Sequence, residues 1–283
     1  MSRGGPIIVG TTPDGRLFIV ATPIGNLGDI THRALATLGA VDVLACEDTR
    51  RTRTIYEHYS LPRPGTILSY HEHNEEQAGE RILALLRQGR TVALCSDSGT
   101  PGISDPGYRI VSAAVEAGIT VEMLPGASAV DMALVLSGLP TSTYTFKGFP
   151  PRQPGKRASF LAAEKDAPHT LVFYESPFRV GVLLRDALTA YGDRRAAVCL
   201  ELTKKFEKVS RGYLADLAAE YGGQPVKGEV TVVIAGNHPK FVRGTQASQA
   251  IADDTDDADR SGKIYHEAHE DVIRNPTSTS CSS

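Results

Sequence analysis

Residues 96–107 (SDSGTPGISDPG) combine the residue types that proteins use to bind a small polar ligand. They follow the apolar run at 91–95 and precede a predicted helix at 106–117, and α/β proteins bind ligands at such strand ends. The glycines allow close backbone approach, and Ser104 or Asp105 can cap the helix. We therefore predict a binding loop here, with an unusually long structural turn as the alternative.

Two further strand-to-helix turns have a similar composition: residues 21–29 (ATPIGNLGD) and residues 124–129 (LPGASA). In a parallel sheet, all three turns lie at the same edge. None matches G-x-G-x-x-G, and no Walker lysine follows a glycine-rich segment, so nucleotide cofactors held by those motifs are disfavoured.

Charged residues follow another predicted strand at 46–53 (CEDTRRTR), where Arg50, Arg51 and Arg53 have side chains that bind phosphates and Asp48 has a carboxylate that can accept a proton. The alternative is that Asp48 or Thr49 only caps a helix whose arginines face solvent.

The histidines of residues 70–75 (YHEHNE) can share one strand face, but no third ligand has a convincing spacing. We predict no metal there, and either a polar strand end or an RNA-facing loop.

Two motifs in the second half of the chain also carry charge. In residues 174–179 (YESPFR), Ser176 and Pro177 suit the start of a helix, which leaves Glu175 and Arg179 without an explanation. Residues 201–208 (ELTKKFEK) form either a solvated face or a substrate-facing cluster. The best basic patch for an RNA backbone consists of Lys147, Arg152, Lys156 and Arg157.

The elements that position these residues alternate along the chain. Strands are predicted at 17–21, 41–46, 91–95, 120–124, 170–174, 196–200 and 229–235, and helices at 31–38, 75–87, 106–117, 178–190 and 213–220. This alternation predicts an α/β protein with a largely parallel first sheet and more antiparallel pairing in the second. We divide the chain into a flexible N-terminus (1–15), an N-terminal domain (16–140), a junction (141–157), a C-terminal domain (158–236) and an acidic, disordered tail (237–283).

Composition restricts the class of protein. The 283 residues suffice for two domains, and the 41% hydrophobic content is that of a globular protein. No apolar stretch is long enough for a membrane span, and the four cysteines lack C-x-x-C spacing, so we expect a cytoplasmic protein with reduced thiols. Residues 237–283 hold eight acids and five Lys or Arg, and the rest of the chain is charge-balanced, so nucleic acid would have to bind local basic patches.

Seven segments together resemble, in order, the motifs of the tetrapyrrole methylase-like family. They are residues 21–30, 46–52, 97–107, 124–129, 174–179, 201–204 (ELTK) and 228–234 (GEVTVVI). The resemblance covers roughly residues 16–236 and is strongest to the ribosomal RNA ribose methyltransferases of that family. Several unusual motifs in one order are far more specific than any single motif.

The resemblance implies a two-lobed class III methyltransferase fold that binds S-adenosylmethionine between the lobes, in a homodimer without a metal. It implies that the substrate is a cytidine ribose 2'-hydroxyl in the decoding region of 16S rRNA, within the small ribosomal subunit. By motif position, the cofactor-binding residues are Pro23, Asp97, Gly99, Thr100, Ile103, Ser128, Ala129 and Val230.

Methyl transfer from a sulfonium requires in-line alignment above all, and a base helps because a ribose hydroxyl is a weak acid. The candidate bases are Glu47, Asp48, Asp97, Glu175 and Glu201, and Lys204 can stabilise a developing alkoxide. From these we predict Asp48, Glu201 and Lys204 as catalytic. The predicted RNA-binding residues are Arg50, Arg53, His71, Lys147, Arg152, Arg157 and Arg179.

Two alternative functions are compatible with parts of the sequence. One is a corrin or porphyrinogen methyltransferase of the same fold, which needs arginines for substrate carboxylates; the motifs at 47–50 and 175–179 argue against it. The other is a non-catalytic module that binds S-adenosylmethionine or RNA during ribosome assembly. Relatives generally have a small helical segment after the second lobe, whereas residues 240–283 are acidic and polar, so RNA affinity here could depend on assembled subunits.

Overall fold

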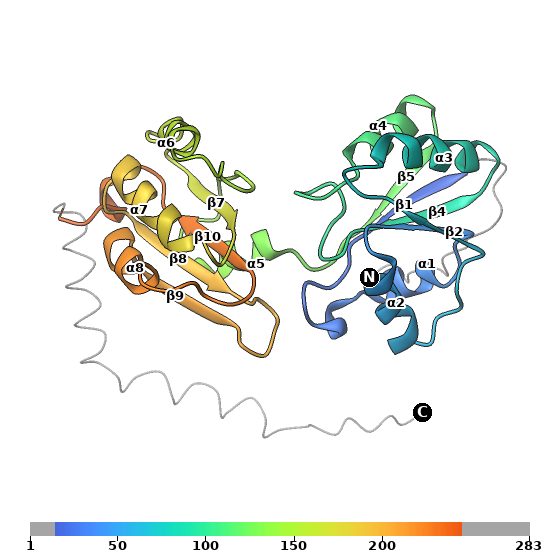
Figure 1. The fold of residues 1–283 in the computed structure, drawn as a ribbon, viewed down its shortest axis with the longest axis horizontal. Coiled ribbons are helices and arrows are strands. Elements are labelled where there is room, and N and C mark those ends of the chain that lie inside the picture. Colours follow the sequence, from blue (N-terminus) through green and yellow to red (C-terminus); the bar gives the residue numbers. More distant parts are fainter. Residues whose placement is uncertain (1–14, 245–283) are drawn as a thin grey trace, which may run out of the picture.

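The computed structural model describes residues 15–244, which form two lobes that each contain one five-stranded sheet (Figure 1). The first sheet has the order β3-β2-β4-β1-β5, and all of its strands are parallel. Its strands are β1 Arg16–Val20, β2 Val43–Cys46, β3 Thr66–Ser69, β4 Thr91–Cys95 and β5 Thr120–Leu124. The predicted parallel first sheet is thereby confirmed.

Helices cover both faces of the first sheet because its strand residues are apolar on both sides. They are η1 Leu27–Asp29, α1 His32–Leu38, α2 Thr49–His58, α3 Glu75–Arg87 and α4 Tyr108–Glu116. The buried face of α3 places Ile82 and Leu86 against one side of the sheet together with Ile110 of α4. On the other side, α1 and α2 contribute Leu38 and Ile55 to a separate cluster.

The second sheet is mixed, as predicted, with the order β6-β7-β10-β8-β9, and only β6 and β7 are parallel. Its strands are β6 Tyr144–Phe146, β7 Thr170–Glu175, β8 Arg195–Leu200, β9 Lys208–Tyr213 and β10 Val230–Ile234. Helices α6 Pro154–Ala162, α7 Val180–Tyr191 and α8 Leu214–Tyr221 contribute to one core cluster. Helix α5 Ala129–Ser137 packs on the opposite face, where Val130, Ala133 and Leu134 meet Val172 and Val233.

The structure places two chain segments differently from our domain division. Helix α5 precedes residue 140 but contacts β8 and β10 of the second sheet. The expected junction at 141–157 contains β6, which pairs with β7, and the start of α6. We therefore propose that the boundary between the lobes falls in the turn at residues 125–128, which leads from β5 into α5.

Two helix starts also differ from the prediction. Helix α4 begins at Tyr108, with Gly107 rather than Ser104 or Asp105 at its N-cap, because Gly107 has a φ of 148°. Helix α7 begins at Val180, so Ser176 does not cap it. The Ser176 hydroxyl instead accepts a hydrogen bond from Phe178 N in the preceding turn.

Residues 237–244 correct the predicted start of the tail. They contain the short helix η2 Pro239–Phe241, and Asn237 N donates to Ala167 O at 2.7 Å. Arg243 pairs with Asp193 at 3.2 Å and also with Asp216. The remainder of the expected tail, 245–283, and residues 1–14 of the expected flexible N-terminus lie outside the described residues.

The described cysteines, Cys46, Cys95 and Cys199, are buried free thiols, which agrees with our interpretation of them as reduced core residues. Cys281 lies outside the described residues. Within residues 15–244, no helix has the length and apolar character needed to cross a bilayer.

Candidate active site

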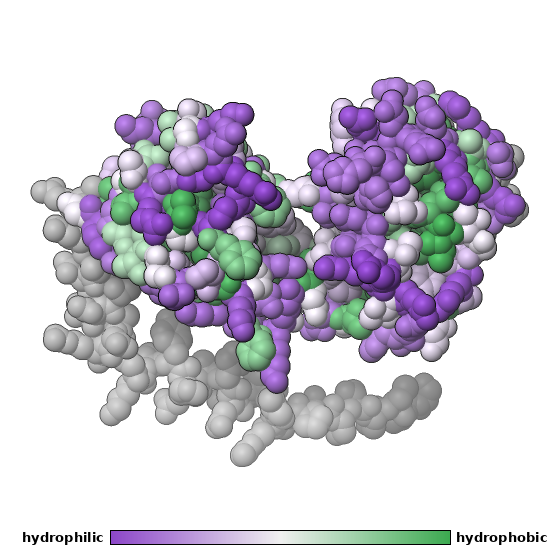
Figure 2. Space-filling model, viewed as in Figure 1, coloured by the Kyte–Doolittle hydropathy of each residue, from purple (hydrophilic) through white to green (hydrophobic). Residues whose placement is uncertain are grey.

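A cavity of about 390 Å³ lies between the two lobes, which are separated by a hollow in Figure 2. The first lobe contributes the turns that follow β1 and β4, and the second contributes the start of α5 and segments at the ends of β7 and β10. The lining residues are Ile24, Ser98, Gly99, Thr100, Ile103, Ser104, Asp105, Ser128, Ala129, Phe149, Tyr174, Glu175, Ser176, Pro177, Gly228, Glu229, Val230 and Thr231.

Backbone hydrogen bonds between the turn after β1 and the turn after β4 fix one wall of the cavity. Thr22 N donates to Gly99 O at 2.8 Å, and Gly99 N donates to Thr22 O at 3.1 Å. Gly99 has a φ of 83°, a conformation that glycine adopts without strain. The turns meet because β1 and β4 are parallel neighbours whose carboxyl ends lie at one edge.

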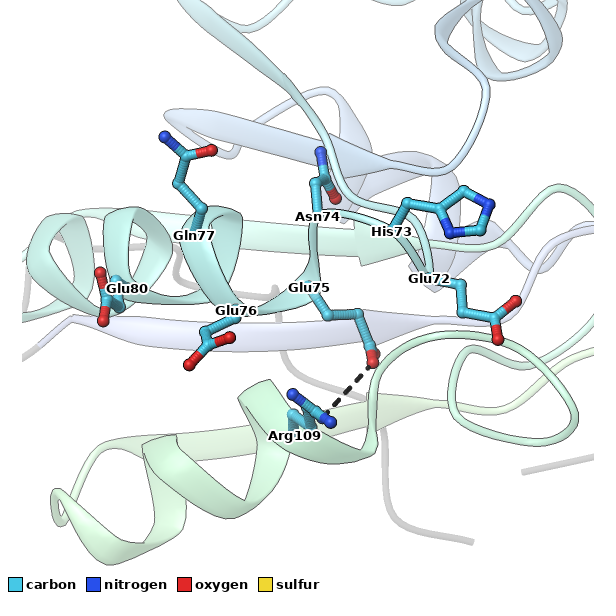
Figure 3. Close-up of a pocket in the computed structure, with 8 residues that line it drawn as sticks. All are labelled: Glu72, His73, Asn74, Glu75, Glu76, Gln77, Glu80 and Arg109. Atoms are coloured by element: carbon cyan, nitrogen blue, oxygen red, sulfur yellow. Dashed lines mark ion pairs between the residues drawn. The ribbon is translucent and has the colours of Figure 1, made fainter.

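The end of the glycine-rich loop is held by Glu75 at the start of α3. Its carboxylate accepts hydrogen bonds from Gly107 N at 3.0 Å and from the Tyr70 hydroxyl at 3.2 Å. Figure 3 shows the Glu75 side chain extending toward α4, where Arg109 lies at 3.8 Å. Because Gly107 ends the loop and begins α4, Glu75 positions the loop relative to α3.

Three carboxylates line the cavity: Asp105, Glu175, which pairs with Arg179 at 2.6 Å, and Glu229, which pairs with Lys204 at 3.2 Å. Burial, followed by the nearby charge of Glu47, raises the pKa of Asp105 to about 6. Burial also raises the pKa of Glu175, against the opposing effect of a hydrogen bond from Ser176 N. A cation binding beside these groups would favour their ionised forms. S-adenosylmethionine carries a sulfonium and an ammonium, so the donor set and the volume of the cavity fit it.

Most of the cofactor residues predicted from the motifs line this cavity. They are Gly99, Thr100, Ile103, Ser128, Ala129 and Val230. Pro23 and Asp97 are not among the lining residues, although their neighbours Ile24 and Ser98 are. The Asp97 carboxylate instead accepts a hydrogen bond from Asp48 N at 2.9 Å and pairs with Arg51 at 3.5 Å. Asp97 therefore joins the cofactor loop to the start of α2.

At the start of α2, Asp48 caps the helix, as one interpretation of the sequence predicts, and the neighbouring arginine side chains are exposed, so they are available to phosphates. Asp48 is the N-cap, and its carboxylate accepts from Arg50 N at 2.9 Å and from the Arg50 guanidinium at 2.7 Å. The hydrogen bonds from the Arg50 side chain lower the pKa of Asp48 to about 2, which makes it a weak base. The Arg50 side chain is 88% exposed, and Arg53 pairs with Glu57 at 2.5 Å.

Glu201 and Lys204, in the second lobe, form an ion pair of 2.8 Å. Lys204 lies beside the turn that follows β1 in the first lobe. Glu201 also accepts from Glu229 N at 2.9 Å, and the hydrogen bond from Lys204 lowers the Glu201 pKa. A side chain at Gly25 would overlap Lys204, and one at Gly228 would overlap the Glu201 carboxylate. These two glycines therefore make room for the pair at the edge of the cavity.

The predicted RNA-binding residues lie in different environments. Arg152 is exposed, whereas Lys147 pairs with Glu164 at 2.6 Å. Arg179 pairs with the buried Glu175 at 2.6 Å. The His71 Nδ1 atom is buried without a hydrogen-bond partner.

Arg157 corrects our prediction of an RNA contact. The residue is only 5% exposed, and its Nε atom lies 2.6 Å from Asp186. It also donates to the carbonyl oxygens of Pro151 and Arg152. With its donors engaged inside the protein, Arg157 stabilises the second lobe and is not available to phosphate.

Sequence reasoning missed Asp105, Phe149, Tyr174 and Glu229 as lining residues. Asp105 lies in the predicted loop, but helix capping also explains an aspartate at that position, so the sequence does not indicate a role for its carboxyl in the cavity. Tyr174 begins the motif at 174–179, but nothing in that pattern distinguishes it as a lining residue. Phe149 and Glu229 carry no local signal, because only the packing of the lobes brings them to the cavity.

A second hollow, of about 410 Å³, lies at the start of α3 and is shown in Figure 3. Glu72, Glu75, Glu76 and Glu80 line it together with Arg109. Its acidic surface would repel an RNA backbone. Within residues 15–244, no group of three or more His, Cys, Asp or Glu side chains has the arrangement of a metal site.

Comparisons with known proteins agree with this geometry. The pattern of the family described as Tetrapyrrole (Corrin/Porphyrin) Methylases matches residues 16–218. The fold is similar to that of uroporphyrin-III-C-methyltransferase from Thermus thermophilus, with a TM-score of 0.55 and 22% identity over 78% of this chain and 94% of that one. At that identity, the similarity supports the fold alone.

Relatives with higher sequence identity show to which group within this family the chain belongs. "Ribosomal RNA small subunit methyltransferase I" of Halalkalibacterium halodurans is 45% identical over 226 residues, which cover 80% of this chain and 78% of that protein. The protein of the same name from Mesorhizobium japonicum is 46% identical over 246 residues, 86% of this chain and 79% of that protein. The chain thus belongs to the tetrapyrrole methylase family of S-adenosylmethionine-dependent methyltransferases, and within it to the ribosomal RNA small subunit methyltransferase I group.

Proposed function

We propose that this protein transfers the methyl group of S-adenosylmethionine to the ribose 2'-hydroxyl of a cytidine in the decoding region of 16S rRNA. We further propose that it acts in the cytoplasm, as a homodimer, on the small ribosomal subunit. The observation that carries this proposal is the convergence of the glycine-rich turns, an acidic cavity and an arginine-bearing helix at one sheet edge. The names of its relatives support ribosomal RNA as the substrate class.

The cofactor would lie against the turns after β1 and β4, near Gly99, Thr100 and Ile103, and reach Ser128, Ala129 and Val230 across the cavity. When bound, it supplies an electrophilic methyl group. Pro23 and Asp97 would act from behind the lining, since Asp97 holds the start of α2 to the cofactor loop.

We propose Asp105 as the general base for the ribose hydroxyl. It lines the cavity, and its pKa of about 6 gives a carboxylate that is ionised at neutral pH yet more basic than an exposed aspartate. Asp48, with a pKa of about 2, suits the positioning of Arg50 better than proton abstraction. Lys204, paired with Glu201, can donate to an oxygen that develops negative charge.

The RNA backbone would run along α2, past Arg50 and Arg53, and reach the exposed Arg152 on the second lobe. His71, Lys147 and Arg179 would contribute from the margins; Lys147 and Arg179 would have to share their charge with existing carboxylate partners. A tetrapyrrole substrate is less suitable, because no arginine or lysine is among the described residues that line the cavity.

Incubation with methyl-labelled S-adenosylmethionine and undermethylated small ribosomal subunits tests the proposal, with nucleoside mass spectrometry of the recovered RNA. We expect 2'-O-methylcytidine to appear in wild-type reactions and to be lost with Thr100→Val under limiting cofactor. Tight cofactor binding without any labelled RNA would contradict the proposal and favour a small-molecule substrate or a binding module. A methyl group on a base carbon or nitrogen would retain the enzyme class and reject the ribose.

A further inference from the structure

An aromatic side chain lies exposed at the mouth of the cavity. Phe149 lines the cavity and is 56% exposed, although a phenyl ring is among the groups that proteins most consistently bury. Ile103 also lines the cavity and is 51% exposed, and it comes from the glycine-rich loop of the other lobe. Two apolar side chains, one from each lobe, are therefore exposed to solvent at the entrance to the site.

The backbone holds Phe149 firmly in this exposed position. Gly148 has a φ of 63°, and its carbonyl accepts a hydrogen bond from Tyr174 N at 3.0 Å. A side chain at Gly148 would lie 3.5 Å from the Ser104 hydroxyl, so the two loops are close neighbours across the cavity. Pro150 restricts the backbone of Phe149 to extended conformations.

Phe149 is also the outermost member of a row of rings. Its centroid lies 5.5 Å from that of Tyr174, which in turn lies 4.8 Å from that of Phe146. Phe146 and Tyr174 pack against the apolar cluster beneath α5, so the row is anchored in the protein interior. A rigid ring that is supported on one side and exposed on the other resembles the surfaces on which proteins stack unpaired nucleobases.

We propose that Phe149 forms the stacking platform for the nucleobase of the nucleotide that is methylated. The inference rests on the proposed RNA function and adds a specificity-determining residue to it. A nucleotide that enters a cavity between two lobes loses stacking contacts with its neighbours in the RNA, and stacking on Phe149 would replace them. The exposed position at the mouth favours the substrate base over the cofactor, which the glycine turns would hold deeper.

Kinetics with undermethylated small ribosomal subunits provide the first test. Phe149→Ala should lower kcat/KM for the subunit about tenfold, because base–aromatic stacking contributes about 1–3 kcal/mol. Phe149→Tyr should retain most of the activity, and the calorimetric Kd of S-adenosylhomocysteine should change less than twofold in both variants. Val115→Ala is the matched control, since Val115 is 62% exposed on α4 but far along that helix from the loop.

The chain contains no tryptophan, so Phe149→Trp introduces a unique fluorophore at the mouth. An RNA hairpin with unpaired loop cytidines should quench its emission, whereas the same hairpin with abasic loop positions should not, when both are bound to saturation by anisotropy. Val115→Trp should respond to neither RNA.

Quenching by S-adenosylhomocysteine alone, with no further change on adding RNA, would overturn the proposal and assign the ring to the cofactor. Unchanged kcat/KM for Phe149→Ala would overturn it as well. If wild-type protein methylates the subunit while these tests fail, only the stacking role is lost; if wild-type protein methylates no RNA, the proposed function itself is rejected.

Discussion

Among single residues, Asp105 shows how the cavity changes the chemistry of an ordinary side chain. Burial and the charges of Glu47 and Asp97 disfavour its ionised form, and only a hydrogen bond from Ser96 opposes them. A carboxylate kept in this environment is a stronger base than one in water. The same environment makes it costly to the folded state, as is common for groups at active sites.

The pH dependence of activity should report Asp105. Because its pKa is about 6 in the folded protein, we expect kcat/KM for the RNA to fall about tenfold per pH unit below that value. Asp105→Asn should lower kcat at pH 7.5 by about 10²-fold or more and abolish this acidic limb. An unchanged pH profile in Asp105→Asn would exclude the residue as the base.

Stability should respond to Asp105 in the opposite direction. The folded-state pKa is raised from 3.8, so the folded protein holds the proton more tightly than the unfolded chain, and stability declines as pH rises from 3.8 to about 6. Asp105→Asn should therefore raise the Tm at pH 7.5 by about 2–4 °C and change it little near pH 3.5, where Asp105 is protonated in the folded protein and mostly protonated in the unfolded chain. Differential scanning fluorimetry at both pH values decides the point, and a lower Tm at pH 7.5 would contradict it.

Arg157 is expected to serve stability rather than RNA binding. Arg157→Met breaks a buried ion pair with Asp186, whose side chain is partly exposed, and should lower the free energy of unfolding by about 2 kcal/mol or more. The exposed Arg152→Met should have almost no effect on stability. Urea denaturation of both variants measures this, and methylation per folded molecule should be normal in Arg157→Met. A loss of RNA affinity at unchanged stability would restore its predicted RNA role.

Residue type and position predict some site residues well and others poorly. Gly99, Thr100 and Ile103 could be predicted because a single loop contains them and its composition restricts its backbone. Arg157 could not, since a basic run looks the same in sequence whether its side chains face solvent or a buried carboxylate. Phe149 reaches the cavity only through the packing of two lobes, which local sequence does not describe.

Among the elements, α2 is joined at its start to the glycine-rich loop and carries the arginines that we propose to bind RNA. Its start is held to the cofactor loop through Asp97, while its exposed arginines extend away from the cavity along the helix. Arg50, Arg53 and Arg63 also line a separate hollow of about 260 Å³ with Ile67 of β3. Arg53 and Arg63 both pair with Glu57, so Arg50 is the member of this group that we expect to contribute most to the proposed RNA path.

Charge reversal on α2 should separate the two kinds of binding. We expect Arg50→Glu to leave the Kd of S-adenosylhomocysteine within about twofold and to lower kcat/KM for the ribosomal subunit about tenfold, with a salt dependence reduced by about one phosphate contact. Arg87→Glu is the control for net charge, because Arg87 lies at the C-terminal end of α3, whereas the glycine-rich loop contacts the N-terminal end of that helix at Glu75. Equal methylation by both variants would remove Arg50 from the RNA path.

Elements bounded by clear changes in residue type were predicted closely: an apolar or β-branched run for the strands, and a helical apolar spacing for α3. The strands β4 Thr91–Cys95 and β5 Thr120–Leu124 and the helix α3 Glu75–Arg87 have their predicted bounds. Strand β6 was missed because only three residues pair, and their pattern is short. The lobe that α5 packs against depends on partners distant in sequence, such as Val233, so its assignment to the first domain followed chain order only.

In the whole molecule, the cavity exists only where the lobes meet, so any ligand in it contacts both. Ile24 of the first lobe packs into the cluster formed by α5 and the second sheet, which provides a direct apolar contact between them. Lys204 packs against Gly25 in the same region. A ligand that joins the turns of one lobe to β10 of the other would strengthen this connection.

Residues 237–244 make contacts with the second lobe that the predicted domain end at 236 leaves out. Val242 pairs with Arg194 in an isolated bridge, and Arg243 binds Asp193 and Asp216 beside α8. The domain end that we predicted at residue 236 excludes these contacts. Truncation after Gly244 should instead keep the Tm within about 2 °C of the full chain, whereas truncation after Asn237 should lower it by about 4 °C or more.

Thermal denaturation of the two truncated proteins and the full chain measures this difference. Arg243→Met in the full chain is the matched control, because it removes the ion pairs but retains the backbone bridge of Val242, and its Tm should fall between those of the two truncations. The same proteins, assayed on undermethylated small ribosomal subunits, separate folding from docking. A Gly244 truncation that is stable and binds S-adenosylhomocysteine normally, yet methylates subunits slowly, would assign residues 245–283 to RNA or ribosome binding. A large loss of Tm in that truncation would contradict the boundary, because it would require stabilising contacts from beyond Gly244.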